Sequence, residues 1–295
     1  MNDAENAPQV SLLIRSSNRN TLARALDSAA AQSWANIEIV VVAASGETHP
    51  KLESTWNGTP LRFLSASAPL SRPVAANMLL ANAHGSYLNF LDDDDELMPH
   101  HVATLVKAIQ AQANMRLAYS VCRVFDDTGN DVGRLGKPGH HLMMFHQNRF
   151  AIHAALFSRQ LVDQGLRFDV SFDRLEDLDF FVACGTRTEF LFVPEVTCTW
   201  HAFSGSSGMG YAGNANRVEQ ERNTLRIRHK WRKHFERWSK ESAGLLALAE
   251  RAVQHGHVSY GASLMAKIPL GSLPEPALTA RYDLVMATLA GASKS

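Results

Sequence analysis

The sequence predicts an α/β fold, in which a mostly parallel β-sheet is flanked by helices and followed by an all-α C-terminal extension. Two observations support this prediction. Short apolar runs alternate with segments of helical periodicity early in the chain, as in proteins whose parallel strands are joined by right-handed crossovers. Beyond residue 214 of the 295 the pattern is helical throughout. We therefore expect an α/β domain at residues 1–213 and a helical extension at residues 214–295.

Strand and helix signals alternate through the N-terminal part of the chain. Residues 10–14 and 37–42 are apolar and rich in β-branched side chains, as is typical of strands covered on both faces. Between them, apolar residues recur at helical spacing from Leu22 to Ala29. The alternation continues with a weaker strand at 61–64, a helix at 73–83, a strand at 86–91 and a helix through 102–109.

After residue 117 this alternation is lost. Residues 126–131 are turn formers and residues 134–141 hold glycine and proline, so we expect a turn and a loop there. The Gly- and Ser-rich residues 204–213 predict a loop that orders when a ligand binds. Strands are expected at 117–125, 150–157, 190–193 and 196–200, and helices at 174–184, 217–240, 242–254, 258–266 and 275–289.

The composition indicates a cytoplasmic protein. Lys and Arg number 29, as do Asp and Glu, and this balance excludes a nucleic-acid binder that relies on bulk positive charge. The cysteines are odd in number and lack metal-type spacing, which indicates reduced thiols: Cys122, Cys184 and Cys198. Residues 1–9 are polar and lack a signal core, and no apolar run approaches the ~20 residues of a membrane helix.

Consecutive aspartates at residues 92–95 follow the strand expected at 86–91. Adjacent carboxylates repel one another and raise one another's pKa, and a bound cation relieves that repulsion. Carboxylate oxygens suit Mg²⁺ or Mn²⁺, which in turn suit a substrate with phosphate oxygens. The strand brings this acidic cluster to the carboxyl edge of the predicted sheet, where open α/β sheets bind ligands. The alternative is a solvated acidic turn that caps the helix after Pro99.

Three landmarks occur in the order that is typical of one enzyme family. They are the apolar residues 10–14 followed by Asn18 and Arg19, the Gly-x-Tyr-x-x-Phe-Leu-Asp-x-Asp-Asp pattern at 85–95, and the Glu-Asp-x-Asp pattern at 176–179. Pro194, Glu195 and His201 fit the end of the family's pattern. Over residues 9–207 the chain therefore resembles a family-2 glycosyltransferase of the GT-A fold.

The resemblance implies an inverting transfer of a sugar from a nucleoside-diphosphate sugar to a hydroxyl group of a glycan or lipid-linked acceptor. It also implies a divalent ion, Mn²⁺ or Mg²⁺, which stabilises the diphosphate as a Lewis acid. By resemblance Asp177 and Glu176 are the catalytic residues, and Asp177 is the general base that deprotonates the acceptor hydroxyl. Without the resemblance, these two carboxylates would be interpreted as acidic residues that a helix N-terminus favours.

Within the acidic cluster the expected roles differ. Asp94 is the expected metal ligand, and Asp92 either holds the ribose or belongs to the metal site. Asp93 and Asp95 are expected to support the nucleotide site or to cap the next helix. His201 is a candidate third metal ligand or phosphate donor, since imidazole ligates when neutral and donates when protonated. A structural histidine is the alternative at this position.

The nucleotide is expected to contact Ser16, Asn18, Arg19, Arg72, Asn77, Asp92 and Asp93. The chain departs from the family at two places near it. The arginine of the family's Ala-Arg-Asn is missing at residues 75–77, and we hypothesise that Arg72, one turn earlier on the same helix face, reaches the site instead. The family's Asp-Asp-Gly-Ser is replaced by Ala-Ala-Ser-Gly at residues 43–46, so the usual contact to the base is absent.

Two other classes of function compete with this one. A catalytically silent GT-A protein, which binds nucleotide or glycan or serves as a scaffold, is favoured by the acids missing at 43–46 and opposed by the intact acidic motifs. A sugar nucleotidylyltransferase needs a Gly-rich phosphate loop, which residues 15–18 do not provide. The sequence gives no indication of oligomeric state.

The helix expected at residues 217–238 is strongly basic. Its apolar residues fall on one face at helical spacing: Ile227, Trp231, Phe235 and Trp238. One interpretation is a solvated face over an apolar stripe that packs on the protein. The other is a peripheral contact with the anionic inner face of a membrane or with a lipid-linked acceptor.

Overall fold

A computed structural model describes residues 7–137, 144, 148–202, 217–268 and 276–292. The chain divides into two compact units, one of residues 1–138 with 149–224 and one of residues 139–148 with 225–295. The predicted boundary between residues 213 and 214, like the predicted loop at 204–213, lies outside the described residues. The two-domain division at that boundary therefore stays a prediction.

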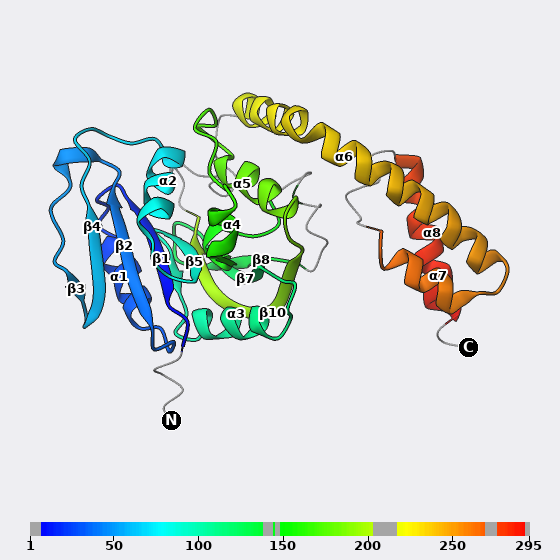
Figure 1. Ribbon diagram of the computed structural model, residues 1–295, viewed down its shortest axis with the longest axis horizontal. Helices are drawn as coiled ribbons and strands as arrows, with labels where there is room; N and C mark the ends of the chain where they lie inside the picture. Colours follow the sequence, from blue (N-terminus) through cyan, green and yellow to red (C-terminus); the bar gives the residue numbers. More distant parts are fainter. Residues whose placement is uncertain (1–6, 138–143, 145–147, 203–216, 269–275, 293–295) are drawn as a thin grey trace. The chain divides into compact units, whose positions relative to one another are not determined.

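The first unit is built on a ten-stranded mixed sheet (Figure 1). Its order is β3-β4-β2-β1-β5-β9-β7-β10-β6, and β8 pairs with β7. Strand β1 lies parallel between β2 and β5, while β9 runs antiparallel to both β5 and β7. The strands are β1 (Val10–Ser16), β2 (Ile37–Ala43), β3 (Thr55–Trp56), β4 (Thr59–Leu64), β5 (Tyr87–Asp92), β6 (Glu96–Leu97), β7 (Leu117–Phe125), β8 (Asp131–Leu135), β9 (Ala155–Ser158) and β10 (Phe190–His201).

Helices flank this sheet, which confirms the predicted α/β class. They are α1 (Leu22–Ala30), α2 (Arg72–Asn82), α3 (His101–Gln110), α4 (Arg159–Asp163) and α5 (Glu176–Gly185), with 3₁₀ turns η1 (Gly46–Thr48) and η3 (Ile152–Ala154). The chain after α1 meets the chain before α3, where Ser33 N donates to Pro99 O at 2.7 Å. Helices α2, α4 and α5 are drawn along the upper side of the sheet in Figure 1, and α3 along its lower side.

Aromatic side chains fill the core under the carboxyl edge of β5. The rings of Phe168 and Phe180 stack with centroids 4.1 Å apart, and Phe90 meets Phe168 edge-on at 5.3 Å. Asn77 of α2 joins this core through two hydrogen bonds to the backbone of Phe168, each 2.8 Å long. Because Phe90 lies two residues before Asp92, this packing fixes the strand end that carries the acidic cluster.

The structure corrects several predicted elements. Residues 150–157 do not form one strand, because the 3₁₀ turn η3 precedes the short strand β9. The two strands predicted at 190–193 and 196–200 are one strand, β10, whose register shifts between Phe192 and Val196. Such a bulge accommodates Pro194, which cannot donate a ladder hydrogen bond. Strand β8 begins before the predicted loop at 134–141 and takes up its first residues.

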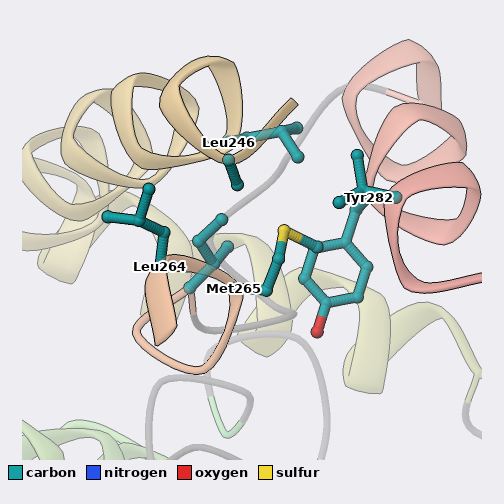
Figure 2. Close-up of a cluster of buried hydrophobic side chains, with 7 residues drawn as sticks. Leu246, Leu264, Met265 and Tyr282 are labelled. Atoms are coloured by element: carbon teal, nitrogen blue, oxygen red, sulfur yellow. The ribbon is translucent and has the colours of Figure 1, made fainter. Parts of the chain in front are cut away.

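The C-terminal region is helical, as predicted, and consists of α6 (Arg217–Gln254), α7 (Val258–Met265) and α8 (Pro276–Ala292). The second unit has its own apolar core, shown in Figure 2, where Leu246 of α6 and Tyr282 of α8 point toward Leu264 and Met265 of α7. Helix α6 is continuous where two helices were predicted, since residues 240–242 contain neither glycine nor proline.

The basic part of α6 agrees in part with the interpretation of a solvated basic face over a packed apolar stripe. Ile227 is buried and Trp231 half-buried, whereas Arg228 and Arg232 are exposed. The side chains of Phe235 and Trp238 lie outside the described part of the structure. No helix within the described ranges combines the length and the apolar character that crossing a membrane requires.

Candidate active site

Arg15 joins the two acidic segments of the chain at the carboxyl edge of the sheet. In the parallel pairing of β1 with β5, Arg15 is the register partner of Asp92. Its Nη2 lies 2.7 Å from Asp92 Oδ1, and its Nη1 lies 3.0 Å from Glu176 Oε1 at the start of α5. Arg15 thus links the aspartate cluster to the Glu-Asp motif. This link agrees with the prediction that the two motifs share one site.

Burial and charge act in opposite directions on these groups. Burial lowers the pKa of Arg15, but the charges of Asp92 and Glu176 outweigh this effect, so the pKa lies above its ordinary value. Burial raises the pKa of Asp92, yet the charge and hydrogen bonds of Arg15, with Arg72 contributing, leave that pKa below its ordinary value. For Glu176, burial is the larger effect, helped by the charge of Asp177, so its pKa stays raised in spite of Arg15. Asp92 is therefore held ionised, whereas Glu176 is fixed in place by Arg15.

The turn after β1 wraps around Asp93. Its Oδ2 accepts from Ser17 N at 2.7 Å, and its Oδ1 accepts from Arg19 Nη1 at 2.8 Å. Asn18, between these two residues, has a φ of 60°, a left-handed conformation that asparagine tolerates better than most residues. Asp93 thus orders the β1–α1 turn, in which the sequence predicts nucleotide contacts.

The negative charge of Asp94 is compensated only in part by Arg19, because other aspartates lie beside it. Its Oδ2 lies 2.7 Å from Arg19 Nη1. Burial, together with the charges of Asp95 and Asp92, raises its pKa to about 7 although Arg19 lowers it. A carboxylate in this state gains from a nearby cation. Asp94 therefore fits the predicted hard metal ion, which proteins often hold by one or two carboxylates plus substrate phosphates.

Asp95 points away from this group and into the protein. It is 3% exposed, its Oδ1 accepts from His201 N at 2.8 Å, and its Oδ2 lies 3.1 Å from Nδ1 of His153. Asp95 is thus a structural carboxylate, in line with the supporting role expected for it.

The side chain of His201, at the end of β10, contacts Glu96 and Phe125. Its Nε2 lies 2.8 Å from Glu96 Oε1, and its ring stacks on Phe125 at a centroid distance of 5.8 Å. To ligate a metal through Nε2, His201 would have to leave Glu96. Its role as a metal ligand remains a prediction, as does that of Asp92.

Asp177 is the more accessible member of the Glu-Asp pair. It is half-buried, and its Oδ1 accepts from Leu178 N at 2.8 Å, whereas Glu176 is buried. The residue before the pair, Leu175, has a φ of 58°, which is strained for a branched side chain. Strain of this kind occurs most often at functional sites, where the surrounding structure maintains it.

The other predicted nucleotide contacts lie around the same edge. Arg72 begins α2, and its charge lowers the pKa of both Asp92 and Glu176. Arg72 is therefore close to both acidic segments. This is required if Arg72 takes the place of the family's arginine from one helical turn earlier. Ser16 Oγ lies 2.7 Å from Nε2 of the buried His49 and accepts from Asn18 N. Asn77 is bonded to Phe168 through both of its side-chain polar atoms, so its nucleotide contact also stays a prediction.

The end of β2 differs from the acidic edge beside it. Ala44 N donates to Ser16 O at 2.8 Å, and Gly46 has a φ of 75°. A Cβ at Gly46 would lie 2.7 Å from the backbone of Ala68, so only glycine fits there. This edge holds small residues in close contact, with no carboxylate at residues 43–46 to contact a base.

Sequence reasoning missed Arg15 and His153. Arg15 was part of a polar turn, and the signal that could have found it is its position in register with the acidic strand end. Within the described residues, the one group of three or more His, Cys, Asp or Glu side chains whose ligand atoms lie within 4.8 Å of one another is Cys122, His153 and Cys198. The predicted set Asp92, Asp94 and His201 is not gathered in this way.

The chain belongs to glycosyl transferase family 2, because the model of that family matches residues 11–163, more than half of the chain. An uncharacterized protein of Sinorhizobium fredii, y4gI, is 25% identical over 242 residues, which cover 75% of this chain and 26% of that protein. The uncharacterized glycosyltransferase MJ1057 of Methanocaldococcus jannaschii is 23% identical over 127 residues, or 41% of this chain and 43% of that protein. The chain thus spans less than half the length of these curated relatives.

Solved structures of the S. aureus protein TarS share the fold. TarS residues 1–349 in complex with UDP-GlcNAc match with a TM-score of 0.56 at 14% identity, over 95% of this chain and 88% of that one. Another structure of TarS residues 1–349 matches with a TM-score of 0.52 at 15% identity, over 66% of this chain and 60% of that one. The GT-A fold that the sequence resemblance implied is therefore confirmed.

Proposed function

We propose that the protein transfers a sugar from a nucleoside-diphosphate sugar to an acceptor hydroxyl, with inversion at the anomeric carbon. The observation that carries this proposal is the Arg15 bridge between Asp92 and Glu176, since it places the aspartate cluster and the Glu-Asp motif at one edge of the sheet. Membership of glycosyl transferase family 2 supports the reaction class. TarS, which shares the fold, has been solved with UDP-GlcNAc, and this supports a nucleotide-sugar donor.

Asp94, with Asp92, would hold a Mn²⁺ or Mg²⁺ ion. When bound, such an ion supplies Lewis-acid stabilisation of the diphosphate leaving group. Arg19 and Arg72 supply positive charge at the same edge, where guanidinium groups can donate to phosphate oxygens. Asp93 keeps the β1–α1 turn, and with it Arg19, in position through its bonds to the turn.

Asp177 is proposed as the general base. It takes the proton of the acceptor hydroxyl as the oxygen attacks the anomeric carbon. The bond from that carbon to the nucleoside diphosphate breaks on the opposite face, and this inverts the configuration. Glu176 does not share this role, because Arg15 binds its carboxylate and it is buried. It is instead a positioning residue that holds the start of α5, and so Asp177, next to the acidic cluster.

The acceptor is proposed to be a glycan or a lipid-linked precursor. The basic residues of α6 around Ile227 are exposed, so they can contact an anionic lipid surface. Flotation with vesicles that contain anionic lipid tests this contact, since a protein that stays at the bottom of the gradient does not use α6 as a membrane surface.

The reaction is tested by screening nucleoside-diphosphate sugars for release of the nucleoside diphosphate in the presence of Mn²⁺. For the active donor, Asp177→Asn is expected to lower turnover about 10²–10⁴-fold with little change in donor affinity, because only proton transfer is lost. The matched control is Asp163→Asn, whose carboxylate is 60% exposed. NMR of the product should show inverted anomeric configuration.

A catalytically silent binding protein is the competing function, favoured by the small residues at the end of β2. Calorimetric titration with a nucleoside diphosphate and Mn²⁺, combined with the donor-turnover assay, separates the two, because a silent scaffold shows no metal-dependent binding. Metal-dependent binding of a nucleoside diphosphate without turnover of any donor supports a silent nucleotide-binding protein, and an Asp177→Asn variant as active as Asp163→Asn contradicts the proposed base.

A further inference from the structure

Two cysteines and a histidine meet inside the first unit, below the acidic cluster. Cys122 of β7 and Cys198 of β10 are register partners in the parallel pairing of these strands. His153, in the turn η3, places its Nε2 3.3 Å from the sulfur of Cys122. The three ligand atoms lie within 4.8 Å of one another, and the three residues are between 0% and 1% exposed.

These separations suit one metal ion. Zn²⁺ binds sulfur at about 2.3 Å and imidazole nitrogen at about 2.0–2.1 Å, so on a tetrahedral ion a sulfur and a nitrogen lie about 3.5 Å apart and two sulfurs about 3.8 Å. The Cys122–His153 distance of 3.3 Å is already near the first value. An ion would require only small movements of these side chains.

Asp95 supplies the partner that a metal-bound histidine usually has. Its Oδ2 lies 3.1 Å from Nδ1 of His153, on the side of the ring opposite the thiols. A carboxylate at that position orients the ring and directs the lone pair of Nε2 toward the metal. The ring of His153 is thus already turned toward the two cysteines.

The charges of the cluster favour a divalent ion. On binding, each thiol loses its proton and His153 ligates through Nε2 as a neutral imidazole. The two thiolates then neutralise a charge of +2, and the carboxylate of Asp95 faces Nδ1 of His153. A monovalent ion would leave one of these buried thiolates uncompensated.

We propose that Cys122, His153 and Cys198 supply three ligands to a thiophilic divalent ion, Zn²⁺ by its ligand preference, at a site separate from the hard-cation site at Asp94. The ion would cross-link β7, β10 and η3. Through Asp95, which also binds the backbone of His201, it would fix one side of the acidic cluster. The proposal does not depend on the glycosyl-transfer reaction.

The test is titration of the full-length, metal-free, reduced protein with Co²⁺. Thiolate ligands give Co²⁺ an intense near-ultraviolet charge-transfer band, which carboxylate ligands do not give. We expect this band to saturate at one equivalent and to disappear when Zn²⁺ is added. Asp94→Ala should retain it, because the carboxylate site makes no contribution to a thiolate band.

Cysteine variants locate the ion. Cys198→Ser is expected to lose the thiolate band, whereas Cys184→Ser, which changes the third buried cysteine in α5, should retain it. If Cys198→Ser does not fold, the melting temperature of Asp94→Ala decides: Zn²⁺ should raise it and Mn²⁺ should not. Absence of a thiolate band in the folded wild-type protein overturns the proposal, and so does a band that persists in folded Cys198→Ser.

Discussion

The two units of the protein use charged residues in opposite ways. In the first unit, Arg15 is 9% exposed and forms ion pairs with Asp92 and Glu176. In the second unit the core is apolar, and the ion pair of Arg281 with Glu250 lies outside it, with Arg281 45% exposed. Buried charge is costly unless it is paired, so its accumulation at one sheet edge indicates a site rather than a source of stability.

This comparison predicts that charge substitutions act strongly in the first unit and weakly in the second, where apolar substitutions should dominate. The largest effect is expected for Arg15→Ala. It leaves Asp92 and the buried Glu176 without their shared partner, and breaking a buried pair costs about 3–5 kcal/mol. Chemical denaturation measures the loss. The control Arg24→Ala removes a more exposed pair with Glu96 and should cost much less; equal losses would break the comparison.

Leu246→Ala is expected to rank second. Leu246 is fully buried among α6, α7 and α8, and truncation of such a leucine costs about 2–5 kcal/mol through lost burial and the cavity left behind. The control is Leu248→Ala in the same helix, whose side chain is 44% exposed. The free energy of unfolding of the two variants should differ by more than about 1 kcal/mol. A smaller difference would mean that the second unit gains little from its apolar core.

The acidic cluster itself should show a pH-dependent effect of intermediate size. Because the pKa of Asp94 is raised to about 7 in the folded protein, the native state keeps a proton that the unfolded chain has lost. Stability is then lost as pH rises from the ordinary pKa of Asp94, near 3.8, through 7. Asp94→Asn should therefore stabilise the metal-free protein by about 1–3 kcal/mol at pH 8, with no gain near pH 4.

Unfolding midpoints across this pH range check the Asp94 prediction. Asp163→Asn, at an exposed carboxylate, serves as the control. Added Mn²⁺ should stabilise the wild-type protein at pH 8 more than Asp94→Asn, because the ion binds the ionised carboxylate. A flat difference between the two proteins from pH 4 to pH 8 would contradict the raised pKa.

The smallest effect is expected for Arg281→Ala. Arg281 Nε lies 2.8 Å from Glu250 Oε1, but exposed pairs of this kind contribute less than about 1 kcal/mol. A double-mutant cycle with Glu250→Gln measures the coupling free energy. A coupling comparable to that of Arg15 with Glu176 would remove the distinction between the two units.

Most of the fold could be predicted from the sequence, because its signals are local. Apolar runs predicted β1, β2 and β5, and segments of helical periodicity predicted α1, α2 and α3. In each case the residue pattern of the segment itself indicates which side chains are buried. The failures have local causes too. The two-residue strands β3 and β6 are too short to give a pattern, and in residues 150–157 the apolar run hides the 3₁₀ turn that carries His153.

The candidate site was predictable only in part. Asp94 and Asp177 were recognised because their motifs are contiguous in the sequence. Arg15 and His153 were missed, since their importance comes from partners that lie far away in the sequence: Asp92 and Glu176 for the first, Asp95 and Cys122 for the second.

The sequence by itself determined the α/β class, the helical C-terminal region and the family, because periodicity and contiguous motifs are properties of neighbouring residues. The tertiary structure alone decided how four adjacent aspartates divide between a half-buried edge and the interior, and which cationic side chain each one meets. It did so through the register of β1 with β5 and of β7 with β10, which sets charges and thiols side by side across the sheet.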